Sequence, residues 1–174
     1  MNRNQSFVGY IENAAEGTGY GLEAEIRNKL TDWLTLFASA SWLETEIEGF
    51  VTADGMDMTG REQAHAPQYQ FNVGFEGWYG ENIQWVLQVD GKDEFYFSNS
   101  HNQKSDSMAL VHFAVNYYVD DWRVSLWRRN LTDEDYEVRG FYFANDPRTQ
   151  YANDETYVQY GEPRRFGITV SKSF

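Results

Sequence analysis

The residues that could act as catalysts or metal ligands are few in this sequence. It contains 3 His and no Cys, which excludes a cysteine nucleophile, a disulfide framework and a thiolate metal site. His65, His101 and His112 stand far apart, and none has an Asp or Glu neighbour at the spacing of a metal site. We therefore predict no catalytic residue, no bound metal and no cofactor.

Two further segments contain residue types that bind cations or phosphate. Asp54, Asp57 and Glu62 offer the oxygen ligands that Ca²⁺ prefers, but their spacing does not fit an EF-hand loop. The glycine-rich run at 17–21 is not followed by a predicted helix, so it does not match a phosphate-binding loop. Solvated loop acids, and glycines at a hairpin and on a crowded wall, explain these segments more simply. An enzyme is not expected.

Composition narrows the class of protein further. The 174 residues include 14 Lys plus Arg against 27 Asp plus Glu, a formal net charge of −13, which does not suit a nucleic-acid partner. Aromatic residues make up 17% of the chain, too many for an acidic disordered protein. No apolar run is long enough for a transmembrane helix, and residues 1–5 do not open a signal peptide. The protein is then cytosolic, or the chain begins partway through a longer one.

The elements that must position these side chains are strands, because apolar and polar residues alternate with period two almost everywhere. The clearest alternation places Tyr69, Phe71 and Val73 against Gln70 and Asn72. The same pattern predicts about eight strands, a weaker one near 6–13 and others at 19–27, 34–42, 68–76, 83–90, 108–118, 122–129 and 165–174.

The predicted connections alternate in length. Turns at 28–32, 79–81 and 119–121 are short, and the first hairpin, at 14–18, is also short. Long polar connections occupy 44–66, 92–105 and 137–162, and the stretch 141–160 is interpreted as an exposed loop. Tight turns on one side and long loops on the other are typical of an up-and-down antiparallel meander, found in soluble and in transmembrane barrels.

The function depends on what the apolar side of these strands contacts. The segments approach the nine to eleven residues that cross a bilayer at a tilt, and lysine, abundant on most water-facing surfaces, is rare. Aromatic residues of the apolar side lie near strand ends, where interfacial girdles form: Trp85, Tyr117, Trp122 and Phe174 near the short turns, and Tyr20, Trp42 and Tyr69 near the long loops. We therefore predict apolar side chains facing lipid and polar ones lining a wet interior.

Four stretches are similar to one known family. They are Tyr20–Glu25, Trp33–Leu43, Arg129–Tyr136 with its Asn-Leu-x-Asp-x-x-Tyr pattern, and Gly161–Gly167 followed by a strand ending in Phe174. In this order they resemble the C-terminal β-barrel portion of TonB-dependent outer-membrane receptors. The resemblance implies an all-β fold, an antiparallel up-and-down transmembrane β-barrel segment holding about eight strands of a barrel of about 22.

The resemblance also implies a function and partners. Residues 1–174 would be the C-terminal part of the barrel domain, without the plug domain and without the N-terminal region that contacts TonB. The chain would lie in the cell outer membrane of a Gram-negative bacterium. It would serve TonB-driven uptake of a scarce ligand, a siderophore, cobalamin or a carbohydrate, with outer-membrane lipid, the missing strands and the plug as partners.

The alternation, the loop composition and the resemblance together give three groups of residues an expected role. The outer-membrane assembly machinery would read Phe166, Ile168, Val170 and Phe174, although Lys172 interrupts that alternation and could reach the membrane interface. Wall charges facing the lumen, whose partners would be plug residues and water or other wall residues, are Glu23, Glu25, Arg123, Arg129 and Arg165. Loop residues suited to contact a ligand are Tyr96, Asn99, Tyr142 and Tyr151.

Some features leave alternatives open. Arg128 falls on the lipid side, which predicts a β-bulge or an exit from the membrane there. An open segment would expose unpaired edges in lipid, so a self-contained eight-stranded outer-membrane barrel with an adhesion or structural role is one alternative. A soluble, aromatic-rich, carbohydrate-binding β-barrel is another.

Overall fold

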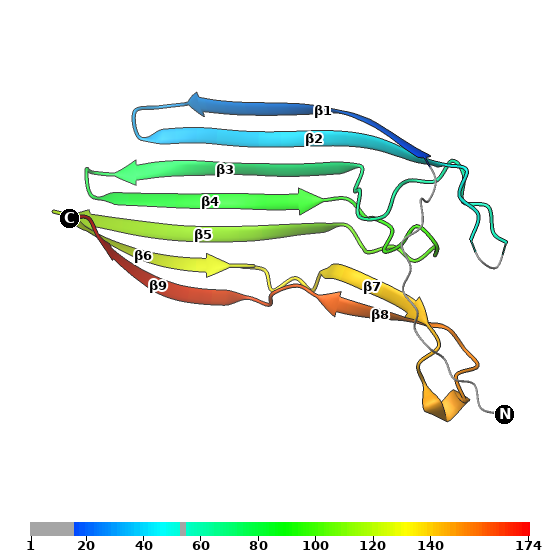
Figure 1. Ribbon diagram of the computed structural model, residues 1–174. Helices are drawn as coiled ribbons and strands as arrows, with labels where there is room; N and C mark the ends of the chain where they lie inside the picture. Colours follow the sequence, from blue (N-terminus) through cyan, green and yellow to red (C-terminus); the bar gives the residue numbers. More distant parts are fainter. Residues whose placement is uncertain (1–15, 53–54) are drawn as a thin grey trace.

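The structure, a computed structural model, describes residues 16–52 and 55–174, and its main element is one antiparallel sheet (Figure 1). Seven strands lie in the order β1-β2-β3-β4-β5-β6-β9. Their bounds are β1 Glu16–Lys29, β2 Leu34–Glu48, β3 Tyr69–Tyr79, β4 Ile83–Lys92, β5 Met108–Val119, β6 Trp122–Arg129 and β9 Arg165–Lys172. The predicted strand near 6–13 lies outside the described residues.

The register confirms the predicted alternation. Across the middle of the sheet Ala38 pairs with Val73, Val73 with Val89, and Val89 with Val111. Because side chains alternate between the faces of a sheet, this row and its apolar neighbours share one face, called here the apolar face. The opposite, polar face carries the adjacent row Ser39, Asn72, Asp90 and Leu110.

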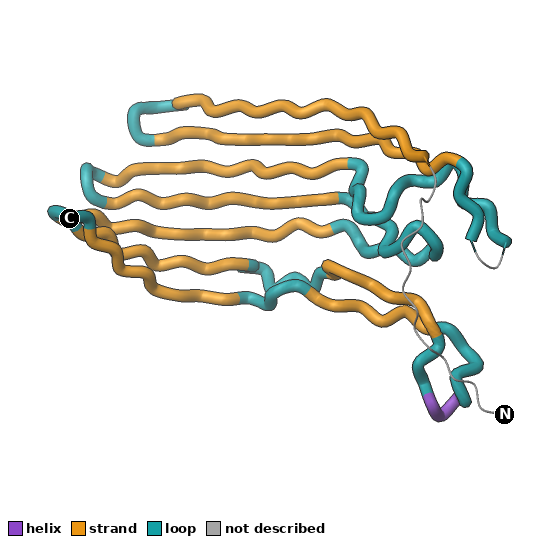
Figure 2. Tube along the Cα trace, viewed as in Figure 1, coloured by secondary structure: helices purple, strands orange, loops and turns teal. Residues whose placement is uncertain are grey.

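Short and long connections lie at opposite ends of the sheet, as predicted (Figure 2). At the short-turn end, left-handed residues close two of the turns, Gly80 with φ 64° and Asp120 with φ 47°. Glycine adopts this conformation without strain and Asp tolerates it. The C-terminus lies at the same end (Figure 1), whereas the long connections gather at the other, called here the loop end.

Two predicted connections are wrong because strands extend through them. The predicted hairpin at 14–18 overlaps β1, where Glu16 pairs with Glu48 and Thr18 with Glu46. The predicted loop 44–66 likewise begins with the last residues of β2. Charged residues at Glu44, Glu46 and Glu48 hid the alternation in the β2 extension, although Ile47 between them is buried.

The predicted loop 137–162 is also wrong, since it contains a hairpin that projects beyond the sheet (Figure 1). Strand β7, Glu137–Phe143, pairs with β8, Glu155–Tyr160, in a separate two-stranded sheet. The 3₁₀ turn η1, Pro147–Thr149, lies near its tip. Most of the hairpin is exposed, so its residues lack the apolar period that identifies a half-buried strand.

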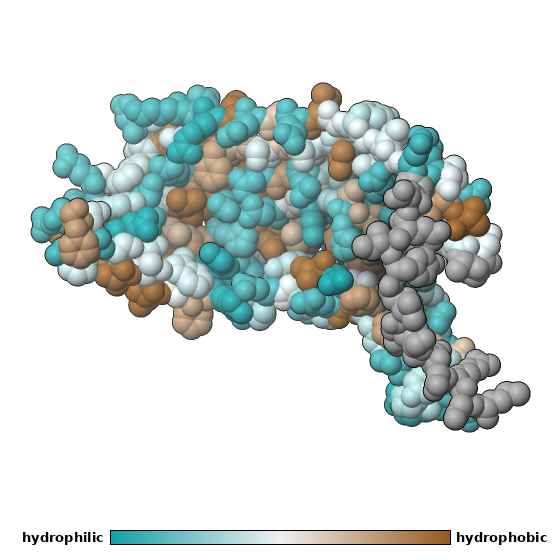
Figure 3. Space-filling model, in the orientation of Figure 1, coloured by the Kyte–Doolittle hydropathy of each residue, from teal (hydrophilic) through white to brown (hydrophobic). Residues whose placement is uncertain are grey.

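The packed core is small and lies mainly at the loop end. Apart from Leu110, its buried hydrophobic residues are Ile47, Met58, Phe95 and Phe97. In Figure 3 hydrophilic residues predominate over the middle of the visible side. The apolar face is not covered by any described segment, and its exposed residues include Leu22, Ile26, Trp42, Tyr69, Phe75, Leu87, Phe113, Tyr117, Trp122 and Leu126.

Candidate functional site: the polar wall and the loop end

The polar face forms a hollow of about 580 Å³ beside β1 to β4. Glu23 and Glu25 line it, together with Asp90 and Lys92. Within residues 16–52 and 55–174, neither glutamate has an ion pair or a side-chain hydrogen bond. The structure therefore places both predicted wall acids on the polar face with their carboxylates free to accept a partner.

The predicted wall arginines lie at the other edge of the sheet, on β6 and β9. Arg129 and Arg165 are direct cross-strand neighbours. Two like charges in this arrangement repel each other and destabilise the sheet unless an anion lies nearby. Arg165 reaches Glu162 at 2.8 Å, and the Arg129 guanidinium lies 5.4 Å from the Trp127 ring centre. Arg123 forms no ion pair in the described part of the chain.

Wall acids and wall arginines thus do not pair with one another, because most of the sheet separates them. The wall ion pair that forms instead joins Arg27 of β1 to Glu76 of β3 at 2.6 Å. Arg27 reaches across β2, where its guanidinium lies 6.0 Å from the Phe37 ring centre. Period-two reasoning placed Arg27 and Glu76 on the polar side but gave no register, so this pair was missed.

A hydrogen-bond chain crosses the polar wall from β3 to Asn130, the residue that follows β6, and sequence reasoning did not predict it. Asp90 accepts hydrogen bonds from the Asn72 amide and, at 3.0 Å, from Gln88. His112 Nε2 lies 3.1 Å from Asp90, and the Asn130 backbone N–H donates to His112 Nδ1 at 3.2 Å. Since Nδ1 is the acceptor, the neutral imidazole carries its proton on Nε2 and donates it to Asp90.

Asn130 joins this wall to the connections leading to and from the hairpin. It is 2% exposed and left-handed, with φ 49°. Its Nδ2 donates to Glu134 O at 2.8 Å and to Glu162 O at 3.3 Å, and its Oδ1 accepts from the Glu134 N–H at 2.8 Å. One side chain therefore bridges the segments that follow β6 and precede β9.

The two segments make further contacts, and together residues 130–136 and 161–164 are called here the clasp. The Glu162 N–H donates to the Tyr136 hydroxyl at 3.1 Å, and the Tyr136 ring packs where a Gly161 side chain would be. The Arg164 N–H donates to Asp133 Oδ1 at 3.0 Å. The two sequence patterns near the end of the chain are therefore two halves of one structural unit.

At the loop end, Arg61 holds the turn 98–102. Its Nη1 donates to His101 O at 2.8 Å and to Asn102 Oδ1 at 3.0 Å, and its Nη2 donates to Ser98 O at 2.5 Å. The Tyr96 ring centre lies 4.4 Å from this guanidinium and 4.3 Å from Lys104 Nζ. Burial lowers the pKa of Arg61 from its usual value, yet a guanidinium stays charged.

Lys104 adds charge pairing to this cluster. Its Nζ lies 2.9 Å from Glu94 and 3.5 Å from Glu62. Partial burial alone would lower the pKa of Lys104, but the Glu94 hydrogen bond and the nearby Glu62 charge outweigh it and raise that pKa. Glu62 therefore has a protein partner. Asp57 accepts a hydrogen bond from the Thr59 N–H, and Asp54, the third acid considered for Ca²⁺, lies outside the described residues.

The structure brings together three of the four predicted ligand contacts. Asn99 accepts a hydrogen bond from the Ala64 N–H at 2.7 Å, and the Tyr142 ring lies 5.5 Å from the His101 ring. With Tyr96 they tie the loops 49–68 and 93–105 to β7. Tyr151 lies apart near the hairpin tip and is 60% exposed.

The predicted assembly residues lie on the exposed apolar face of β9 or follow it, and include Phe166, Ile168, Val170 and Phe174. Arg128 shares that face, but β6 keeps a regular register with both neighbours, so the predicted bulge is wrong, and the alternative, an exit from the membrane there, stays a prediction. The Arg128 side chain can extend past the end of the strand without a bulge, because β6 ends one residue later.

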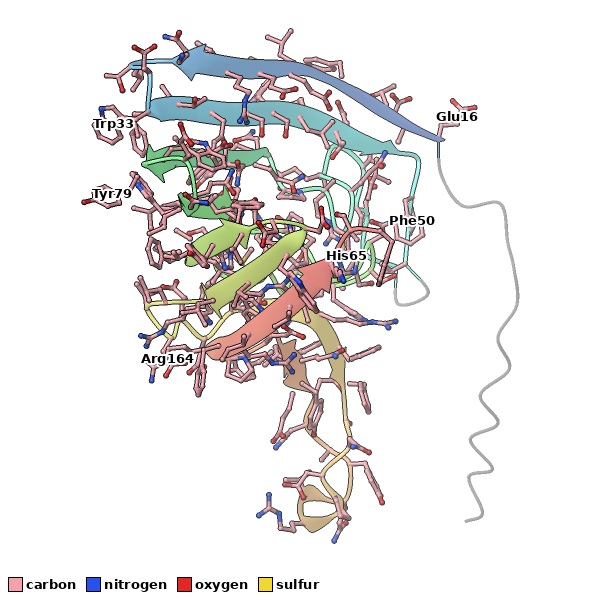
Figure 4. The ribbon with its side chains drawn as sticks, turned by 90° about the vertical axis from the view of Figure 1, so that its left-hand side faces the viewer. Glu16, Trp33, Phe50, His65, Tyr79 and Arg164 are labelled. Atoms are coloured by element: carbon pink, nitrogen blue, oxygen red, sulfur yellow. The ribbon has the colours of Figure 1, made fainter. Side chains whose placement is uncertain are left out.

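The part of the chain that the structure describes lacks two kinds of feature. No group of three or more His, Asp or Glu is placed to hold a metal ion. No helix in this part is long and apolar enough to cross a membrane. In Figure 4, which looks from the short-turn end, Trp33 and Tyr79 lie at one side of the sheet and the loop residues Phe50 and His65 toward the other.

Comparison with known proteins assigns the family. Residues 2–131 match the family described as TonB dependent receptor-like, beta-barrel. The chain therefore belongs to this family, a family of receptors rather than enzymes, as the sequence patterns predicted.

Solved structures agree on the fold. The chain is similar to the ferric yersiniabactin uptake receptor FyuA from Yersinia pestis, with a TM-score of 0.72 and 17% identity over 91% of this chain and 24% of that one. It is also similar to the ferric citrate transporter FecA in the unliganded form, with a TM-score of 0.70 and 19% identity over 90% of this chain and 25% of that one. The siderophore receptor PiuA from Acinetobacter baumannii is similar with a TM-score of 0.69 and 17% identity, over 91% of this chain and 22% of that one. The chain thus spans about a quarter of the length of these receptors and is a fragment of a larger barrel fold.

Proposed function

We propose that this chain is a wall segment, the C-terminal part of the barrel, of an outer-membrane receptor that imports a scarce ligand with energy from TonB. In this role the apolar face contacts lipid, the polar face lines the lumen and the loop end faces the outside. The short turns then face the periplasm. TonB is contacted by a region outside this chain.

The apolar face is the observation that carries the proposal. All residues of β3 on that face are uncharged, from Tyr69 through Phe71, Val73 and Phe75 to Tyr79. Its 11 residues extend about 34 Å, or about 26 Å in height when tilted at about 40°. This height matches the apolar band of an outer-membrane barrel, about 25 Å tall, and the tyrosines lie at its two borders.

The polar wall supports a plug as the occupant of the lumen. Carboxylates without partners at Glu23 and Glu25, and guanidiniums at Arg123 and Arg129, are costly in a confined space unless counter-charges or water reach them. A plug with cationic groups toward β1 and anionic groups toward β6 and β9 would satisfy both sides.

A ferric chelate is the ligand class that the comparisons favour. FyuA and FecA are, by name, uptake proteins for ferric yersiniabactin and ferric citrate. The loop end of this chain offers exposed Tyr151 and half-buried Tyr142, whose rings suit recognition of organic chelators. Cobalamin and carbohydrate are the alternatives that an uptake assay separates.

Insertion and uptake test the proposal at two levels. The full-length protein is refolded with phospholipid vesicles, and we expect it to float with them and to migrate faster on gels when unheated. Uptake of radiolabelled iron chelates, cobalamin and maltodextrin is then compared in cells with and without the gene, and with and without TonB. Monomeric solubility without detergent would refute the membrane location, and TonB-independent uptake would refute the energy source.

A soluble barrel is disfavoured because its apolar face must be covered. Leu22 is 74% exposed on that face, and no described segment packs over it. A self-closing eight-stranded barrel is disfavoured because the described sheet matches a segment of larger receptors, with a TM-score of 0.72 over 24% of the FyuA chain.

A further inference from the structure

Lys172 is the residue that departs from the apolar pattern of the last strand, and its surroundings are unusual. It pairs with Trp122 across the β6–β9 ladder, which places it on the apolar face next to the Val124–Val170 row. Its Nζ lies 5.1 Å from the Trp122 ring centre and 5.2 Å from that of Phe174. An ammonium group is attracted to aromatic faces at such distances.

No carboxylate neutralises this ammonium group within the described residues. The contrast with Lys29 is direct, because Lys29 belongs to the same short-turn end but lies on the polar face and pairs with Asp32 at 3.0 Å. On the apolar face, Lys172 is the one cation that the seven strands place at this end. An ammonium group without a carboxylate partner, held between two aromatic rings on the apolar face, is available to bind an anion from outside the chain.

We propose that Lys172, Trp122 and Phe174 form a rim site that binds the phosphate of a membrane phospholipid at the periplasmic border of the apolar band. The inference rests on the proposed function. The rings lie at the depth where amphipathic aromatics meet headgroups, and lysine binds phosphate as a compact point charge. The anion is therefore a lipid headgroup, held while its acyl chains cover Val170 and Val124.

Closure of the barrel leaves this site open. A strand added at the free edge of β9 lies in the plane of the sheet and bonds to its backbone. The side chains of Lys172 and Trp122 project perpendicular to that plane, so they remain turned toward the lipid. A residue of the added strand then lies beside Lys172 in the sheet but does not cover the Lys172 side chain.

Proximity between lysine nitrogen and lipid phosphorus tests the proposal. The full-length protein, labelled with ¹⁵N-lysine, is reconstituted in phosphate-free buffer in vesicles of phosphatidylcholine with phosphatidylglycerol, and ³¹P dephasing of the lysine side-chain signal is measured. Lys172→Met should remove one dephased lysine signal. The matched control Lys29→Met should keep that signal. Lys172→Arg, which also lacks the lysine nitrogen but keeps the charge, helps to assign it. Native mass spectrometry should show about fivefold weaker phosphatidylglycerol retention by Lys172→Met, with Lys172→Arg close to wild type.

The outcomes separate this inference from the proposed function. Equal dephasing in wild type and Lys172→Met, with normal vesicle insertion, overturns the rim site alone. Equal dephasing by inorganic phosphate in a phosphorus-free detergent shows a free-anion site and overturns the assignment to lipid. Failure of the wild-type protein to insert overturns the proposed function and the rim site with it.

Discussion

Replacing Asn130 should release the hairpin from the wall while leaving the rest of the sheet in place. The Asn130 side chain makes three hydrogen bonds, two with Glu134 and one with Glu162, and each buried bond contributes about 1 kcal/mol. Asn130→Gly keeps the left-handed φ of 49° free of strain and should cost about 3 kcal/mol. Asn130→Ala should cost about 1 kcal/mol more, because a Cβ without a compensating side chain disfavours that conformation.

Hydrogen exchange of single amides measures this loss locally. At about 1.4 kcal/mol per tenfold, protection of the Glu134 and Gly161 amides should fall roughly a hundredfold in Asn130→Gly and further in Asn130→Ala. The matched control is Asn145→Ala, at an exposed position with no side-chain hydrogen bond in the described residues. Protection in Asn130→Ala equal to that in the control would refute the clasp, and uniform loss throughout the sheet would show that its effect is not local.

Three further predictions concern the loop end and the clasp. Arg61→Met removes the bonds that hold the turn 98–102, so limited proteolysis should cut 93–105 at least tenfold faster; unchanged cleavage would contradict this role. Gly161→Ala places a methyl group on the Tyr136 ring, so exchange at the clasp should rise as in Asn130→Gly, and an unchanged rate would show that the ring can move aside. Hydrogen bonds from Arg148 lower the pKa of Asp146 below 3.8, so the turn at η1 should be fully stabilised above pH 3.8 and lose that contribution as the pH falls through the lower folded-state pKa; NMR shifts of the Arg148 amide measured down to pH 2 check this, and a midpoint above 3.8 would contradict it.

The central strands were predictable because one of their faces carries apolar side chains and the other carries mainly polar ones. Tyr69, Phe71 and Val73 alternate with Gln70 and Asn72, and the register keeps these sets on opposite faces. Family patterns added the barrel, which alternation alone could not distinguish from a soluble sheet. The wall positions of Glu23, Arg123 and the other wall charges followed from the same parity, although whether they bind a plug stays a prediction.

Strands without a buried face, and contacts between segments distant in the sequence, were not predictable. The hairpin β7–β8 packs on the loop end around Gly140 and Tyr142 and is largely exposed elsewhere, so its sequence carries no sustained apolar period. The bonds from Asn130 to Glu162 and from Arg61 to Ser98 depend on register and loop path, which composition does not encode. Tyr96 and Asn99 were chosen for their chemistry, but their partners Lys104 and Ala64 show that they also hold the loops in place.

Because the small core lies at the loop end, the loop end and the sheet should respond to different denaturing conditions. The dry contacts of this core join the connections β2–β3 and β4–β5 around Met58, Phe95 and Phe97, and Phe97 packs on Gly140 of the hairpin. Water drives the burial of these rings, whereas in the proposed outer-membrane location the strands depend on hydrocarbon outside them. Urea should therefore loosen the loop end first while the wall persists in lipid, and removing lipid should collapse the wall while the loops stay folded.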